Sequence, residues 1–175
     1  STTVQVIREI TNSKSQMLTA ILNDTERDLR GLAASLDASM DVSSATALLE
    51  RFENDHTVSG LTVIGRGGQA LYGPENAHLL KGIPKEFAAK VAVDGFEMSD
   101  PLIDENGGRR VLFGTALTGG RILYASIPAA SMQKACGETT YLGEGYSYIL
   151  GRDGKIVVPP VRYNYEHISI LYQQR

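Results

Sequence analysis

A chain of 175 residues with 42% hydrophobic residues is long enough to bury the core of one ordinary domain or of two small ones. Its 20 acidic and 17 basic residues are mixed along the sequence, so a net charge of −3 argues against nucleic acid or an anionic membrane surface as a partner. The single cysteine, Cys136, excludes an internal disulfide and a four-cysteine metal site, and we expect it to be a small buried residue.

The sequence contains no apolar run near the ~20 residues that a membrane span requires, and no secretory signal pattern at its beginning. It begins inside a helical pattern and stops at residues 173–175 without a turn. We therefore expect a piece of a longer protein, with any membrane anchor outside this sequence.

Residues 4–40 have the pattern of one long amphipathic helix, with charged and amide residues opposite an apolar stripe. Such a helix would be about 50 Å long, more than a core of this size needs, so we expect part of it to project. A second, short helix should follow, with Ser43 or Ser44 as its N-cap and residues 54–56 at its end. The stripe of the long helix consists of Ile7, Ile10, Met17, Ile21, Leu29, Leu32 and Leu36.

From residue 57 onward, short apolar runs alternate with turn residues, which is typical of antiparallel strands. Residues 61–64 and 69–72 flank a glycine-rich turn and predict a β-hairpin. Pro84 should open a short helix that Gly95 closes. Further strands are then expected at residues 96–99, 110–117 and 121–127.

The last part of the chain predicts a helix over residues 129–136, a second hairpin within residues 146–158 and a helix over residues 164–173. Helices first and hairpins later indicate an α+β fold. We predict three parts: the two helices in residues 1–56, a sheet module in residues 57–137, and the beginning of a second, incomplete module in residues 138–175.

An internal repeat supports the second module. Residues 64–68 (IGRGG) and residues 150–154 (LGRDG) are each followed, after five residues, by a proline, Pro74 and Pro160. The aligned glycines, Gly65 and Gly151, are 86 positions apart. The alternative is that any two hairpins share such a turn, because glycine-rich turns are common between apolar strands.

The order of these segments resembles a known family. A long helix, a hairpin and a short helix are followed by SDPLIDENGG (residues 99–108), VLFGTALTGGRILYASIP (111–128) and GYSYILGRDGKIVVPP (145–160). This order is similar to that of the double Cache, PAS-like sensor regions of bacterial histidine kinases, chemoreceptors and diguanylate cyclases, over roughly residues 1–160.

The resemblance implies an extracytoplasmic domain that binds a small ligand in its first module, and a long helix that leads up from a membrane anchor. Asp100, Asp104 and Gly107 look like part of a loop motif of that family. Its amino-acid-binding members carry an Arg-x-Trp-Tyr signature, and this chain has no tryptophan, which argues against an amino-acid ligand of the usual kind.

A ligand pocket between the sheet and its covering elements would be lined by side chains from the first hairpin and the central strands. Phe113 and Thr115 should share one face by period-two alternation, although core packing is the better explanation for Phe113 and Met98. Asp100 and Tyr72 are the stronger ligand candidates, because a polar group in a small cavity needs a partner. The predicted ligand-binding residues are Tyr72, Met98, Asp100, Phe113, Thr115 and Tyr124.

Known catalytic patterns are not found in the sequence. The three histidines, His56, His78 and His167, have no metal-binding spacing, and the glycine-rich turn lacks the lysine of a phosphate loop. Asp100 and Asp104 lie beside turn residues, where capping explains them better than acid–base catalysis does. We therefore expect no enzyme activity, no metal and no cofactor.

Three hypotheses follow. The chain is the sensor of a membrane-anchored receptor, with a small-molecule ligand and a weak homodimer through its N-terminal helix. Alternatively, it is a structural module that dimerises permanently and binds no small molecule. A cytosolic PAS-like dimerisation domain would share the same fold. Apolar segments of about twenty residues on both sides of this piece in its gene would favour the receptor.

Overall fold

The chain divides into two compact units, Thr25–Pro128 and Ser1–Asp24 with Ala129–Arg175. The computed structural model describes residues 2–73, 83, 85–99, 102–103, 107–128 and 131, and short strands within residues 139–158. Side chains are described for Gln16 and, within those ranges, from residue 20 to residue 131. The architecture below concerns mainly the unit Thr25–Pro128.

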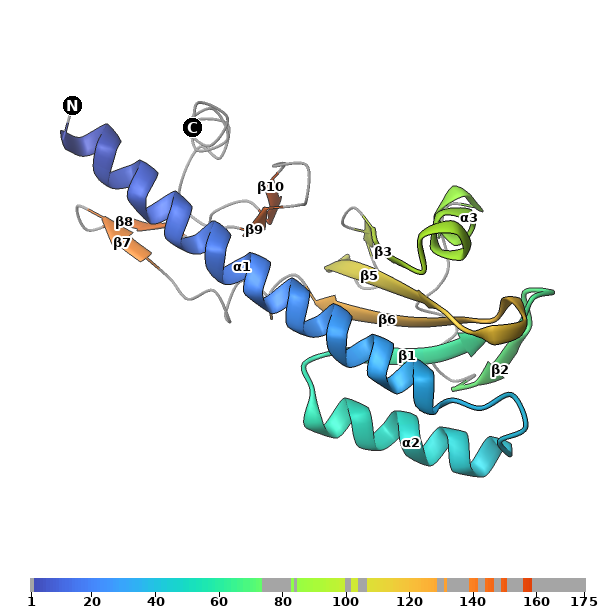
Figure 1. Ribbon diagram of the computed structural model, residues 1–175. Helices are drawn as coiled ribbons and strands as arrows, with labels where there is room; N and C mark the ends of the chain where they lie inside the picture. The colour runs from blue at the N-terminus through green and yellow to red at the C-terminus, as the bar shows by residue number, and fades with distance from the viewer. Residues whose placement is uncertain are drawn as a thin grey trace. The chain divides into compact units, whose positions relative to one another are not determined.

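An antiparallel sheet lies at the centre of this unit (Figure 1). In the described residues it has six strands in the order β2-β1-β6-β5-β3, and β4 also pairs with β5. The central strands β5 and β6 each have a run of five buried residues, which indicates that both faces of the sheet are covered. The strands are β1 (Ser59–Ile64), β2 (Ala70–Tyr72), β3 (Phe96–Met98), β4 (Leu102–Ile103), β5 (Arg109–Ala116) and β6 (Ile122–Pro128).

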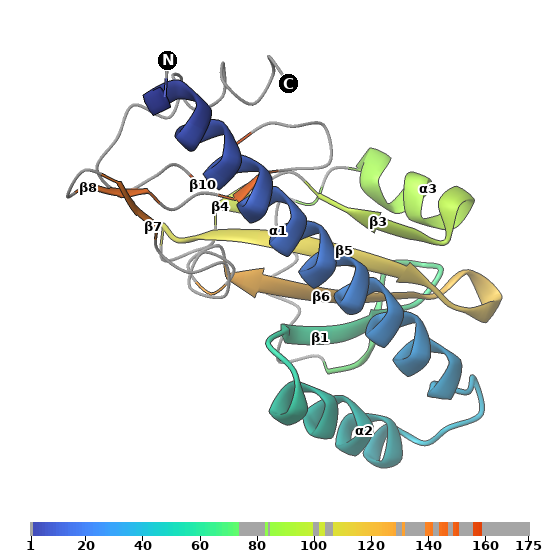
Figure 2. The same cartoon turned by 60° about the vertical axis from the view of Figure 1, so that its left-hand side comes forward.

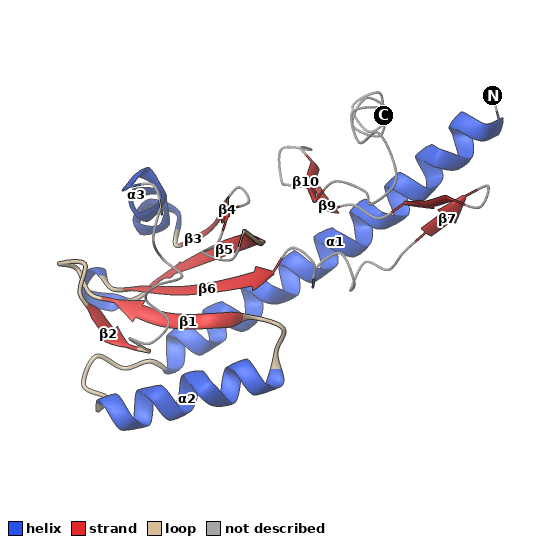
Figure 3. Cartoon of the chain, turned by 180° about the vertical axis from the view of Figure 1, so that it is seen from behind, coloured by secondary structure: helices blue, strands red, loops and turns tan. Residues whose placement is uncertain are grey.

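Helices cover the two faces of the sheet separately (Figures 2 and 3). Helix α1 (Thr2–Ser35), from Thr25 on, and helix α2 (Val42–Asp55) lie on one face, and helix α3 (Lys85–Asp94) lies on the other. The predicted stripe of the long helix continues into the core at Leu29, Leu32 and Leu36, which are 1%, 6% and 3% exposed. These leucines recur at three- and four-residue steps, so one face of the helix is buried.

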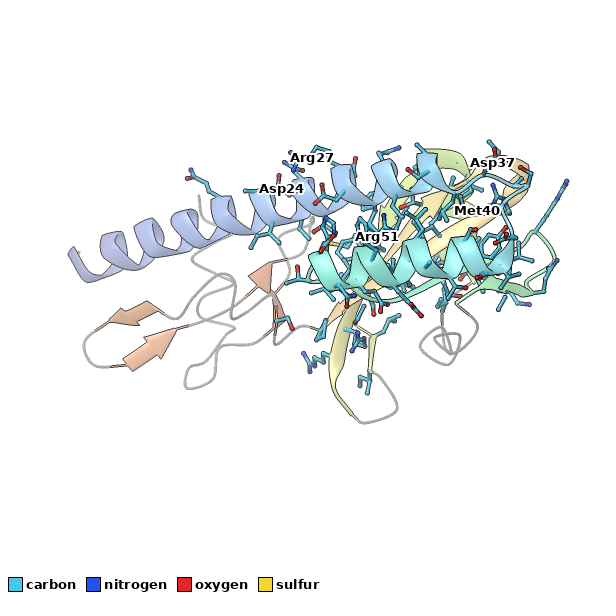
Figure 4. All side chains as sticks on the ribbon, turned by 90° about the horizontal axis from the view of Figure 1, so that it is seen from below. Asp24, Arg27, Asp37, Met40 and Arg51 are labelled. Atoms are coloured by element: carbon cyan, nitrogen blue, oxygen red, sulfur yellow. The ribbon has the colours of Figure 1, made fainter. Side chains whose placement is uncertain are left out.

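The long helix ends five residues earlier than expected, at Ser35. Leu36 is buried beyond the helix end, and a turn follows in which Asp37 accepts a hydrogen bond from the Ser39 backbone N–H at 2.8 Å. This turn leads through Met40 to α2; Figure 4 shows Asp37 and Met40 in the connection between the two helices. Such local side-chain to backbone bonds compete with the helix, and they explain its early end.

The predicted N-cap of the second helix was wrong. Asp41 caps α2, because its carboxylate accepts a hydrogen bond from the Ser44 backbone N–H at 2.6 Å, while Ser43 and Ser44 lie within the helix. The same bond holds the pKa of Asp41 below its ordinary value. Aspartate at this position also suits the positive end of the helix dipole.

The predicted hairpins and the α+β class are confirmed. Strands β1 and β2 pair across the glycine-rich turn, with a bulge between Val63 and Ile64. Gly95 ends α3 in a left-handed conformation, at φ 83°, and its N–H donates to the carbonyl of Val91 at 2.8 Å. Only a residue without a side chain adopts this conformation at little cost, so the sequence located the end of α3 correctly.

The second unit contains two described strand pairs. Strand β7 (Thr139–Tyr141) pairs with β8 (Glu144–Tyr146), and β9 (Ile149–Leu150) pairs with β10 (Ile156–Val158), all antiparallel. The second pair lies within residues 146–158, where a second hairpin was expected. Apart from Ser131, the helices expected at residues 129–136 and 164–173 lie outside the described residues, and a complete second module stays a prediction.

None of the helices in the part of the chain that the structure describes combines the length and the apolar character needed to cross a bilayer.

Gly114 allows α3 to lie close to β5. A Cβ atom at this position would lie 2.6 Å from Cγ2 of Val91 and 3.2 Å from Cε1 of Phe87. Both side chains are buried and cannot move far, so we expect Gly114→Ala to lower the free energy of unfolding by about 1–3 kcal/mol through overpacking.

Gly31→Ala is the matched control, because a Cβ atom at Gly31 in α1 would meet nothing within 4 Å. Alanine favours the helix there, and a gain of about 0.5–1 kcal/mol is expected. Urea unfolding of both variants measures the difference. Equal effects of the two substitutions would show that the contact between α3 and β5 is not as tight as described.

Candidate functional site

A groove of about 750 Å³ lies between α3 and the end of the sheet formed by β1, β2 and β6. Its volume is in the range of small-molecule sites, which are concave and mostly apolar. The strands contribute Ile64, Ala70, Ile122 and Tyr124, and the α3 side contributes Ile83, Lys85, Ala88, Ala89 and Ala92. The turns contribute Gly65, Arg66, Gly68 and Gly120. We call this cavity the α3 groove.

Tyr124 is a buried part of the wall, with only 5% of its surface exposed. Its ring lies 6.3 Å from the Phe87 ring of α3, centroid to centroid, in a stacked arrangement. Burial raises the pKa of the Tyr124 phenol above its ordinary value. Among the described residues no hydrogen bond to its hydroxyl is found, so the phenol remains available to a ligand.

Two basic residues from different elements line the α3 groove, Arg66 in the hairpin turn and Lys85 at the first position of α3. The turn that carries Arg66 is closed by a bond from the Gly65 N–H to the Gln69 carbonyl at 2.8 Å. The Arg66 stem then crosses Gly120, where an added Cβ atom would lie 3.2 Å from both Cγ and Cδ of the arginine. Gly120 therefore leaves the space in which Arg66 reaches the groove.

A second polar group lies on the same face of the sheet, farther along β5. The Arg110 guanidinium donates to Ser126 Oγ at 3.0 Å and to Ser59 Oγ, and Ser126 Oγ donates to the Ser59 carbonyl at 3.2 Å. Arg110 shares this face with Gly114 by alternation along β5. Its described partners are hydroxyl groups, so its positive charge is not neutralised by them.

The predicted ligand-binding residues fall on both faces of the sheet. Tyr124 lines the α3 groove. Met98, Phe113 and Thr115 lie on the opposite face, because Gly114, between the last two, faces α3 and Met98 is paired with Phe113. Phe113 is 0% exposed and stacks on Phe96 with 6.0 Å between ring centroids, which is core packing.

Tyr72 also lies away from the groove. It pairs with Val63, a core residue on the face that α1 and α2 cover, and its hydroxyl donates to the Met40 carbonyl at 2.9 Å. Its own carbonyl accepts from Thr62 Oγ1 at 2.8 Å. These bonds tie β2 to the connection between α1 and α2. Asp100, the other strong candidate from the sequence, lies outside the described residues.

The sequence reasoning missed the residues that make most of the groove. Arg66 was read only as part of a turn, and the alanines of α3 were not singled out. Ala88, Ala89 and Ala92 recur at helical spacing, and small residues on one side of an amphipathic helix leave room beside a sheet. That stripe was the signal available in the sequence.

No group of three histidine, cysteine, aspartate or glutamate side chains within the described ranges is arranged to hold a metal ion.

No family model matches the chain, and the curated proteins contain no match. Solved structures do share its fold. The sensory domain of the Campylobacter jejuni chemoreceptor Tlp3 (CcmL) with isoleucine bound has a TM-score of 0.66 at 11% identity, over 95% of this chain and 73% of that one. The ligand-binding domain of that receptor in complex with L-valine gives 0.67 at 11% identity, with the same coverage.

In complex with L-norvaline, the same domain gives a TM-score of 0.65 at 10% identity, over 94% of this chain and 74% of that one. The chain has the fold of a chemoreceptor ligand-binding domain. At this identity the likeness concerns the fold, and function has to be argued from the site.

The pH dependence of stability tests the burial of Tyr124. Burial raises the folded pKa of Tyr124 above 10.0, because the folded protein disfavours the ionised phenol. Stability is therefore unaffected by this ionisation at neutral pH and is lost as the pH rises from 10.0 through the folded pKa. We expect Tyr124→Phe to change stability little at pH 7 and to reduce its loss above pH ~10. Urea unfolding at both pH values measures the effect.

Tyr72→Phe serves as the comparison, since it removes the bond to Met40 and should cost about 1 kcal/mol already at pH 7. If Tyr124→Phe behaved like Tyr72→Phe at neutral pH, the Tyr124 hydroxyl would have a structural partner and would not be available to a ligand.

Proposed function

We propose that this chain is the extracytoplasmic ligand-sensing region of a transmembrane receptor of the double Cache type, and that a small molecule binds in the α3 groove. The observation that carries the proposal is the groove itself, on one face of a sheet whose fold is that of chemoreceptor ligand-binding domains. The other parts of the receptor, its membrane anchors and its second module, belong to the proposal.

The groove is separated from the long helix by a single layer of strands. On β5, Gly114 faces α3, and its neighbours Phe113 and Thr115 face the opposite way, toward α1 and α2. There Phe96 stacks on Phe113, and the Arg30 guanidinium of α1 lies 5.7 Å from the centroid of the Phe96 ring. A ligand that shifts α3 against β5 would therefore act on α1 through contacts of packed side chains.

A buried hydroxyl marks this layer as adjustable. Thr115 is 2% exposed, and its Oγ1 has no hydrogen-bond partner among the described residues. An unpaired buried hydroxyl costs free energy, so a small movement of β5 that gave Thr115 a partner would be favoured. In this proposal Thr115 takes part in signal transfer and does not contact the ligand.

Of the predicted site residues, Tyr124 is the one that we propose as a ligand contact from its place in the groove. Asp100 remains a proposal from the sequence alone and is not among the described residues that line the α3 groove. The proposed function involves no chemical step. The alternative, a dimerisation module without a ligand, makes no use of a groove of this size.

Filling the groove tests the proposal. A thermal-shift screen against a mixed metabolite library should find a stabilising compound, because a ligand of the folded state stabilises it by about 2.7 kcal/mol at 100 times its Kd. Ala88→Phe places a ring in the groove wall and should abolish that shift while the protein stays folded.

Val93→Phe on the same helix is the control, since Val93 is 84% exposed and does not line the groove. It should keep the full shift. A library without any hit on the unmodified chain, or a hit that Ala88→Phe leaves unchanged, would count against ligand sensing in the α3 groove.

The proposed weak homodimer has its own test. Ile10 and Met17 belong to the predicted apolar stripe of α1, and their side chains lie outside those that the structure describes. We expect sedimentation equilibrium to show self-association that rises with concentration and that Ile10→Glu and Met17→Glu abolish. Asn12→Glu, on the predicted polar face, should have no effect; a strict monomer would remove the dimer from the mechanism.

A further inference from the structure

The charged residues among the described lining of the α3 groove are both basic. Arg66 and Lys85 line it, and none of its described lining residues is an aspartate or a glutamate. We infer that the α3 groove binds a small monoanion with an aliphatic tail, such as a branched short-chain carboxylate, in preference to a zwitterionic amino acid. This inference rests on the proposed function and names the class of its ligand.

The apolar part of the lining fits the tail. Ile64 and Ile122 come from the strands, and Ile83 and Ala88 come from the α3 side, so aliphatic groups face each other across the groove. All four side chains are half-buried, which means that a ligand can still remove part of their apolar surface from water. A branched aliphatic chain of four to six carbons is the class of group that such a surface favours.

The positive charge at the groove has two separate local sources. The stem of Arg66 lies against Gly120, so its guanidinium is presented from the hairpin side. Lys85 is the first residue of α3, where free backbone N–H groups and the helix dipole add to its positive charge. Glu86, in the same first turn, is exposed and does not line the groove.

Among the described lining residues an amino acid finds no carboxylate partner for its ammonium group. That group has three donors, and the described lining contains no aspartate or glutamate. Two nearby cations would also repel the ammonium group. A carboxylate without the amino group keeps the attraction of both cations and avoids this cost.

Three matched probes separate these ligand classes: 4-methylpentanoate, L-leucine and 3-methylbutylamine share the same branched tail and differ in charge. We expect titration calorimetry at low salt to give 4-methylpentanoate a Kd at least about tenfold below that of leucine, and no binding of the amine. Added salt should weaken the carboxylate, because exposed charges are screened.

Substitution of the cations tests their role. Arg66→Gln and Lys85→Gln should each weaken 4-methylpentanoate about threefold, and the double variant about tenfold, as expected for exposed ion pairs. Lys90→Gln, an exposed lysine of α3 that does not line the groove, should leave the Kd unchanged. Ala88→Phe should abolish binding of the probe.

Failure of this inference can be told from failure of the proposed function. Leucine or the amine binding as tightly as the carboxylate, or a carboxylate Kd that Arg66→Gln and Lys85→Gln leave unchanged, overturns the preference for an anion. The same holds if none of the probes binds while the mixed library yields a hit that Ala88→Phe blocks, although ligand sensing then stands. No hit from any source overturns both.

Discussion

The close contact of α3 with β5 determines the geometry of the groove face. Residue 114 is a glycine, so Val91 and Phe87 of α3 lie directly over the strand. A single methyl group at residue 114 would clash with both side chains. Because protein interiors are packed nearly as tightly as crystals, this contact fixes the position of α3 on the sheet. The groove is the space that remains between α3 and the β1–β2 hairpin once that contact is made.

The opposite face is fixed by the end of α1. Arg121, 8% exposed, donates to the Leu36 carbonyl just beyond the helix at 3.3 Å and to the Thr118 carbonyl at 3.0 Å. A cation at this position is favourable, because the last carbonyls of a helix are unpaired and carry partial negative charge. Together with the bond from Tyr72 of β2 to Met40, these bonds tie the end of α1 and the connection after it to β2 and to the turn between β5 and β6. The α3 groove and helix α1 thus lie on opposite faces of the same sheet.

Local patterns predicted the elements well, and their faces poorly. The hairpin at residues 61–72 and the end of α3 at Gly95 followed from turn chemistry, which depends only on neighbouring residues. The N-cap at Asp41 was missed because Asp41, Ser43 and Ser44 lie within four positions and each can cap a helix, and the backbone decides between them. Alternation correctly placed Phe113 and Thr115 on one face, yet it carried no information about which face holds a groove, since β5 is buried on both.

The sequence by itself determined the α+β class and the order of helices and hairpins, because these depend on periodicity and on turn residues. Only the tertiary structure decided that Met98, Phe113 and Thr115 face α1 and α2. It also decided that Arg66 and Lys85, 19 positions apart in the sequence, line one groove with alanines of α3. The physical reason is that a cavity is what packing leaves unfilled. The position of the groove depends on how closely α3 approaches β5 and on the contact of the Arg66 stem with Gly120. Neither contact can be predicted from the pattern of a single segment.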